Sequence, residues 1–140
     1  MVELRRHFQG KPRLISEIRG FIRKGCRQIW NESSDLPAIS QLELAVSETA
    51  GNIMLHGMRG QPGGLIELTL NVENERVSVT FSYPGCSFTP EAVPPPDFNG
   101  RAESGYGQFL IQQSVDEVHF SRDDAGRCTI CLTKNRTRCV

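Results

Sequence analysis

Residues 42–57 read LELAVSETAGNIMLHG and have the residue spacing of an amphipathic helix. At about 100° per residue, one stripe of such a helix is apolar and carries Leu42, Ala45, Val46, Thr49 and Ile53. A polar stripe lies beside it, because Glu48, Asn52 and His56 are spaced four apart. Leu44 and Leu55 border the polar stripe on its other side. The stretch therefore places a carboxylate and an amide between two apolar borders, where an unpartnered polar group is costly.

This polar stripe has two interpretations. In the first, Glu48 and Asn52 simply hydrogen-bond to neighbouring backbone on an ordinary core helix. In the second, the stripe belongs to an active site, with Glu48 as a general base and Asn52 as an oxygen ligand of a hard cation such as Mg²⁺. The spacing alone agrees with both, so the rest of the chain has to discriminate between them.

The other segments predict an α+β fold. Apolar residues at helical spacing predict a helix over Pro12–Trp30, a second helix ending at His56, and a third over Gln108–Val115. Period-two alternation predicts two hairpins, Leu65–Val72 with Arg76–Tyr83 and Glu117–Ser121 with Arg127–Thr133. We expect the order helix, helix, strand, strand, lid, helix, strand, strand. The expected architecture is a two-layer sandwich, with helices packed on one face of a mostly antiparallel sheet.

Length and charge limit the classes of function. The 140 residues suit a single domain spanning 1–140, and the 16 basic and 16 acidic residues cancel. This balance gives no reason to expect nucleic acid or a membrane as a partner, and no stretch is long enough to span a bilayer, so we expect a cytoplasmic protein. Residues 1–31 nevertheless carry eight Lys and Arg against Glu3 and Glu17. This excess predicts either an acidic partner surface or a merely solvated helix face.

Two further motifs bear on the chemistry. Gly105-Tyr106-Gly107 precedes the third helix, where backbone N–H groups and the helix dipole favour phosphate. Alone it is also an ordinary loop-to-helix turn, but a nucleotide pocket would use it together with Glu48 and Asn52. The segment at about 86–104 is rich in Pro and Gly and predicts a lid. Cys128 and Cys131 have the spacing of a metal or redox pair, yet strand alternation points them to opposite faces.

Three blocks of this sequence resemble the anti-sigma regulatory factors, the small serine kinases of bacterial partner-switching systems. That family belongs to the superfamily of gyrase, heat-shock chaperone, histidine-kinase and mismatch-repair ATPases. The first block, SETAGNIMLHG at 47–57, is similar to the family's Asn-containing helix. The second, YPGCSFTP at 83–90, resembles its Asp-x-Gly turn. The third, ESGYGQFLI at 103–111 with DEV at 116–118, resembles its second glycine box.

The resemblance implies a role for each matching residue. Glu48 would activate the hydroxyl of a serine or threonine on a protein substrate, and Asn52 would bind the Mg²⁺ that bridges the phosphates of ATP or ADP. Gly105 and Gly107 would contact phosphate through backbone N–H groups, and Gly85 would let the chain pass close to the adenine. His56 and Tyr106 lie inside the matching blocks, and the resemblance implies that they also help to bind the nucleotide.

The resemblance also implies partners. These are a sigma factor, an antagonist protein of the anti-anti-sigma type and, since family members are often dimers, a second copy of the chain. It places the first predicted helix, with Arg13, Arg19 and Arg23, against the sigma factor.

Tyr83 departs from the family pattern. The family has an aspartate there, which accepts a hydrogen bond from the adenine amino group. Strand parity points Tyr83 to the same side as Val77, Val79 and Phe81, and its ring is bulky enough to fill the adenine site. Losing a buried charged acceptor costs roughly 1.5–3 kcal/mol. Two functions therefore stand: an ATP-dependent serine/threonine kinase that also binds a sigma factor, and a nucleotide-independent interaction module of the same fold.

Overall fold

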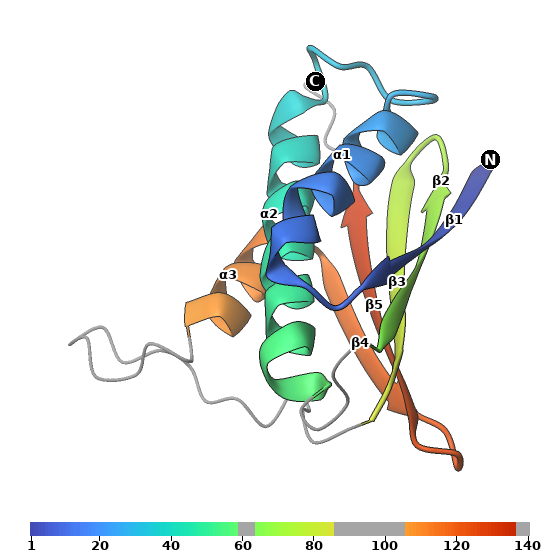
Figure 1. The fold of residues 1–140 in the computed structure, drawn as a ribbon. Coiled ribbons are helices and arrows are strands. Elements are labelled where there is room, and N and C mark those ends of the chain that lie inside the picture. The colour runs from blue at the N-terminus through green and yellow to red at the C-terminus, as the bar shows by residue number, and fades with distance from the viewer. Residues whose placement is uncertain (59–63, 86–105, 137–140) are drawn as a thin grey trace.

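The computed structural model describes residues 1–58, 64–85 and 106–136, and these form two layers. One layer is an antiparallel sheet with the strand order β1-β2-β3-β5-β4. Its strands are β1 (Val2–Gln9), β2 (Leu65–Val72), β3 (Arg76–Pro84), β4 (Glu117–Arg122) and β5 (Arg127–Asn135). The other layer covers one face of the sheet (Figure 1) and contains α1 (Ile15–Cys26), α2 (Leu36–Asn52) and α3 (Tyr106–Ser114). The predicted fold class is confirmed.

The two predicted hairpins are present. In β2 every second residue is buried, and β3 repeats the pattern with Val77, Val79, Phe81 and Tyr83. Because the side chains of a strand alternate between its faces, these buried rows form the core under the helices. The β4–β5 hairpin turns at Gly126, whose φ of 85° lies in the left-handed region that favours glycine.

The first strand corrects the predicted order of elements, which began with a helix. β1 pairs with β2 over its whole length, from Val2 opposite Val72 to Gln9 opposite Leu65. It is an edge strand with mostly exposed side chains, and Phe8 is its buried residue. Arg6 stands where alternation would place an apolar residue, and its guanidinium lies 4.7 Å from the centre of the Phe8 ring. The alternation of apolar and polar residues in β1 is therefore weak, and this segment becomes a strand because it pairs with β2.

The helices follow the prediction with changes at their ends. The predicted helix over Pro12–Trp30 is a short 3₁₀ turn, η1 (Pro12–Leu14), followed by α1. The predicted core stripe of α2 is fully buried from Leu42 to Ile53. Beyond Asn52 the helix continues as a π turn, η2 (Ile53–Gly57), in which the N–H of Met58 donates to the carbonyl of Ile53 at 2.8 Å. A π turn inside a helix often marks a functional site.

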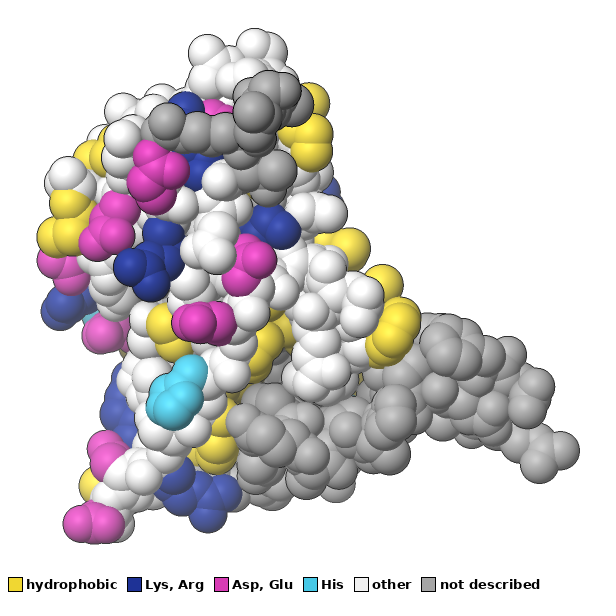
Figure 2. Space-filling view, turned by 180° about the vertical axis from the view of Figure 1, so that it is seen from behind, with side chains coloured by type: hydrophobic (Ala, Val, Ile, Leu, Met, Phe, Trp, Pro, Cys, Tyr) yellow, Lys and Arg dark blue, Asp and Glu magenta, His cyan; other side chains and the backbone are white. Residues whose placement is uncertain are grey.

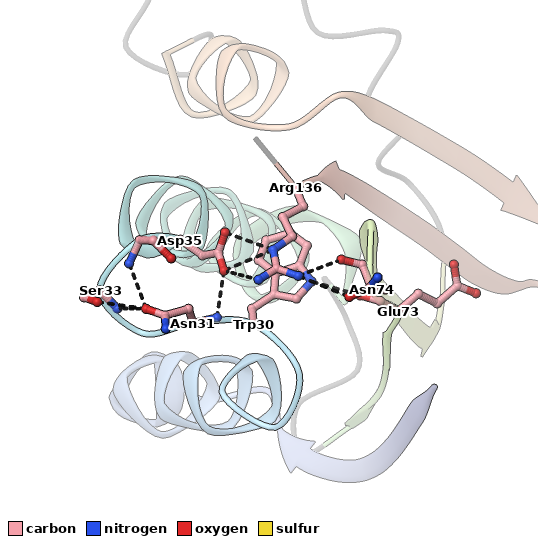
Figure 3. Close-up of polar contacts among 8 residues, drawn as sticks. Trp30, Asn31, Ser33, Asp35, Glu73, Asn74 and Arg136 are labelled. Carbon is pink, nitrogen blue, oxygen red and sulfur yellow. Dashed lines mark hydrogen bonds and ion pairs between the residues drawn. The ribbon is translucent and has the colours of Figure 1, made fainter. Parts of the chain in front are cut away.

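A buried ion pair joins distant parts of the chain at one end of the domain (Figure 3). The Asp35 carboxylate accepts hydrogen bonds from Arg136 Nε at 3.1 Å and from the N–H of Asn31 at 2.7 Å. Arg136 Nη1 also donates to the Asn74 carbonyl at 3.1 Å, and its guanidinium lies 5.8 Å from the centre of the Trp30 ring. These contacts tie the end of β5 to the α1–α2 loop and to the β2–β3 turn.

The surface carries mixed charge. On the face seen in Figure 2, acidic and basic side chains are interspersed and neither sign fills a continuous area, as the zero net charge leads one to expect. Across the described ranges, none of the helices combines the length and the apolar character that crossing a membrane would require.

Candidate functional site

Glu48 and Asn52 lie one turn apart on α2 and face the start of α3. Both side chains are half-buried, and the point where they meet α3 is Gly107. An atom at the Cβ position of Gly107 would lie 3.0 Å from Glu48 Oε2 and 3.5 Å from Asn52 Oδ1. A Cβ atom there would crowd the Glu48 carboxylate, whereas it would be in ordinary van der Waals contact with Asn52. The structure thus brings Gly107 beside Glu48 and Asn52, which precede it by 59 and 55 positions in the sequence.

The start of α3 brings backbone N–H groups close to the side chains of Glu48 and Asn52. The first N–H groups of a helix have no acceptor within that helix, and the helix dipole gives this end a partial positive charge. Gly107 stands in the first turn of α3, so its bare backbone faces the carboxylate and the amide of α2. We call Glu48, Asn52 and Gly107 the phosphate cradle, because N–H donors suit phosphate oxygens while carboxylate and amide oxygens suit a hard cation.

Tyr83 lies on the core face of β3, as its parity predicts, and its side chain has 0 % exposure. Its ring packs against the π turn at the end of α2. An atom at the Cβ position of Gly57 would lie only 2.8 Å from Tyr83 Cε2 and 3.4 Å from Tyr83 Oη. Within the part of the chain that the structure describes, the phenol oxygen has no hydrogen-bond partner. Among the described residues, packing is therefore what holds this ring against η2.

The sequence contains a sign of this contact in Gly57, the residue that follows the predicted end of the helix at His56. This glycine also continues the buried stripe, since Thr49, Ile53 and Gly57 are spaced four apart. A glycine on a buried helix stripe can mark the close approach of another group, and here that group is the Tyr83 ring.

Burial of Tyr83 and Cys26 predicts a loss of stability in alkali. Burial raises the pKa of the Tyr83 phenol from 10.0 to about 12, against the opposing positive charge of Arg122. Burial, with a smaller contribution from Glu43, also raises the pKa of the Cys26 thiol from 9.0 to about 12. At a pH between the unfolded and the folded pKa of either group, the unfolded chain has released a proton that the folded chain still holds. The free energy of unfolding should therefore fall as pH rises from 9 to 12, by up to about 1.4 kcal/mol per pH unit for each group.

The variant Tyr83→Phe isolates the phenol in this prediction. It keeps the ring and removes a buried hydroxyl that lacks a partner, so at pH 7 it should be neutral or up to about 1 kcal/mol more stable. Urea unfolding at a series of pH values measures both effects. The variant should lose less stability than the wild type above pH 10, and identical slopes there would contradict the assignment.

The remaining predicted site residues are only partly described. His56 is half-buried in η2, one turn beyond Asn52. Gly85 follows β3 with a φ of 82° and helps to line a shallow hollow of about 300 Å³, together with Pro84, Ala125, Gly126 and Arg127. Tyr106 begins α3, but its side chain lies outside what is described. Gly105 and the predicted lid at 86–104 also lie outside the described residues.

The thiol alternative gains no support from the strand geometry. Cys128 is buried on the core face of β5 whereas Cys131 is half-buried on the other face, as alternation predicts. The described ranges contain no group of three or more His, Cys, Asp or Glu side chains able to hold a metal ion. The pair does not form a metal site within these ranges.

The arginines of α1 have contacts within the chain. Arg23 Nε donates to Glu43 Oε2 at 3.0 Å and its Nη2 at 2.6 Å, while Arg19 Nε lies 4.0 Å from Glu43 Oε1. Glu43 is buried on α2. Part of the basic excess in residues 1–31 therefore balances a carboxylate of the protein itself.

The profile of the histidine kinase-like ATPase domain family matches residues 8–134, and the chain belongs to this family. The histidine kinase domain of the blue-light activated histidine kinase from Erythrobacter litoralis EL346 has the same fold, with a TM-score of 0.54 and 18% sequence identity. That match covers 87% of this chain and 61% of the other.

Curated relatives are closer in sequence. An anti-sigma F factor of Bacillus cytotoxicus is 28% identical over 100 residues, which are 69% of this chain and 68% of the relative. A serine-protein kinase RsbW of Listeria monocytogenes is 30% identical over 105 residues, which are 69% of this chain and 66% of the relative.

Proposed function

We propose that this protein is an anti-sigma regulator that acts as an ATP-dependent serine/threonine protein kinase. Its family is one of ATPase domains, and its relatives carry the names anti-sigma F factor and serine-protein kinase. The observation that supports the proposal best is the phosphate cradle. In it a carboxylate and an amide of α2 lie beside a glycine at the N-terminus of α3, where a Cβ atom would lie 3.0 Å from Glu48 Oε2 and 3.5 Å from Asn52 Oδ1.

Glu48 acts as the general base in this proposal. Its carboxylate takes the proton of a serine or threonine hydroxyl on the antagonist protein, and the hydroxyl oxygen forms a bond to the γ-phosphorus. The bond between that phosphorus and the bridging oxygen breaks, and ADP leaves with the electron pair. Glu48 is half-buried and close to the start of α3, so it can meet both a protein substrate and a phosphate.

The described residues at the phosphate end fit Mg²⁺ and a triphosphate. Asn52 would hold the ion through its amide oxygen, since Mg²⁺ prefers oxygen ligands, and Gly107 leaves the space that phosphate oxygens need. When bound, the ion neutralises charge on the phosphates. Glu48 and Asn52 stay one turn apart on a rigid helix, which keeps the base and the cation ligand in a constant relation.

The proposed partners are a sigma factor, which the protein would sequester, and the antagonist that it phosphorylates. Two relatives named anti-sigma F factor and serine-protein kinase support this pair. We also propose that residues 1–140 act as one domain, with residues 86–104 as its lid, and that the protein forms a homodimer.

Nucleotide binding can be tested by thermal unfolding. Millimolar MgATP or MgADP should raise the melting temperature, because a ligand that binds only the native state adds about 2.7 kcal/mol of stability at 100 times its dissociation constant. Asn52→Ala should lose the part of the shift that depends on Mg²⁺.

The matched control is Gln112→Ala, which removes an exposed amide on α3 outside the cradle and should retain the whole shift. An unchanged melting temperature for the wild type in both nucleotides would contradict the kinase and leave the interaction module as the function.

A further inference from the structure

The end of the site nearest β3 differs from the phosphate cradle. Tyr83 stands two residues before Gly85, at the position that the resemblance to anti-sigma regulatory factors assigns to adenine recognition. The ring is fully buried between β3 and η2. Because η2 follows Asn52 directly, the ring packs against the continuation of the helix that carries Glu48 and Asn52.

The Tyr83 ring leaves no free space between itself and Gly57. The clearance at Gly57 is too small for a methyl group, since the Cβ position lies 2.8 Å from Cε2 and 3.3 Å from Cζ of the ring. A base that entered between Tyr83 and Gly57 would have to displace a large buried aromatic side chain from the core. The Tyr83 ring therefore leaves no space for a base beside Gly57.

The chemistry of the ring supports the same conclusion. A carboxylate can only accept hydrogen bonds and so selects the amino group of adenine, whereas a phenol both donates and accepts. The Tyr83 hydroxyl is buried and has no partner among the described residues, so it faces neither solvent nor another polar group there. It supplies no acceptor equivalent to a carboxylate.

The phosphate cradle is independent of this ring. Glu48 and Asn52 lie on the side of α2 that faces α3, and Gly107 contributes only backbone. In the proposed function these groups would contact phosphate and a cation, and neither contact depends on which base is attached. We propose that the protein selects its phosphoryl donor through the triphosphate and its cation and not through the base, because Tyr83 fills the base end of the site. This inference rests on the proposed function.

Binding of four nucleotides to the full chain tests the inference. Isothermal titration with the Mg²⁺ complexes of ATP, GTP, CTP and UTP should give dissociation constants within about threefold, the factor of less than one hydrogen bond. Inorganic tripolyphosphate with Mg²⁺ should compete with ATP. A wild-type preference for ATP of about tenfold or more over CTP and UTP would overturn the inference and leave the proposed kinase intact. Failure of all four to bind would overturn both.

Variants at Tyr83 locate the cause. Tyr83→Asp removes the ring and supplies an acceptor, so it should strengthen ATP binding by about tenfold or more while CTP and UTP change little. Tyr83→Phe keeps the ring and should keep the equal binding of the four nucleotides, which provides a test even where Tyr83→Asp does not fold. A preference for ATP in Tyr83→Phe would show that the hydroxyl, and not the filled space, determines the selectivity.

Discussion

Glu48→Gln is expected to slow phosphoryl transfer to the antagonist protein by roughly 100-fold or more, while ATP binding is retained. Glutamine has nearly the shape of glutamate, so the close packing of Glu48 Oε2 against Gly107 survives the change. The amide cannot take the proton of the attacking hydroxyl, so only the chemical step loses its base. Single-turnover transfer of labelled phosphate from ATP measures the rate, and titration calorimetry measures the binding.

A matched control separates this effect from a general loss of charge. Glu17→Gln makes the same change at an exposed position on α1, away from the cradle, and should leave both rate and affinity unchanged. A Glu48→Gln protein that still transfers phosphate at more than a third of the wild-type rate would exclude Glu48 as the base. Loss of ATP binding in a folded variant would instead assign the carboxylate to ligand binding.

Asp35→Ala is expected to reduce the free energy of unfolding by roughly 3 kcal/mol, because removing one partner of a buried ion pair leaves the other charge without compensation. The side chain of Arg136 is 15% exposed and that of Asp35 is 5% exposed, so water compensates only in part. The Asp35 hydrogen bond is the main cause of the raised pKa of Arg136, which stays charged in the variant. Urea unfolding should show a lower midpoint with an unchanged slope.

Two further variants test this assignment. Glu3→Ala breaks an ion pair with Arg5 at 3.2 Å in which both side chains are exposed, and it should cost less than about 0.5 kcal/mol. The double variant Asp35→Leu/Arg136→Met removes both charges and should be more stable than Asp35→Ala, since no buried charge is left alone. A loss below about 1 kcal/mol in Asp35→Ala would show that the ion pair does not hold these segments together.

Much of the site could be predicted because its helix is a local feature. The stripe from Leu42 to Ile53 and the spacing of Glu48 and Asn52 follow from helix geometry, and the structure buries the apolar stripe as expected. Leu44 and Leu55, which were expected to border the polar stripe, are exposed, because no other element covers that side of the helix within the described residues. The strands β2 and β3 were equally clear from alternation. The role of Gly107 needed the resemblance to a family, since a glycine before a helix has many uses.

Other features depend on residues that are distant in the sequence. β1 has too little alternation to be recognised, and pairing with β2 more than 50 residues later makes it a strand. Asp35 and Arg136 are 101 positions apart. The contact between Tyr83 and Gly57 requires β3 to lie beneath the end of α2, and the sequence indicated only that the ring points inward.

The sequence by itself determined the helices and the two hairpins, because periodicity acts through short-range backbone geometry, and the resemblance of three blocks indicated the family. The tertiary structure alone decided which groups meet. It set the Tyr83 ring against Gly57 in η2, and it paired the charge of Asp35 with that of Arg136. The physical reason is that burial and close packing depend on the distances between whole elements, which no local pattern contains.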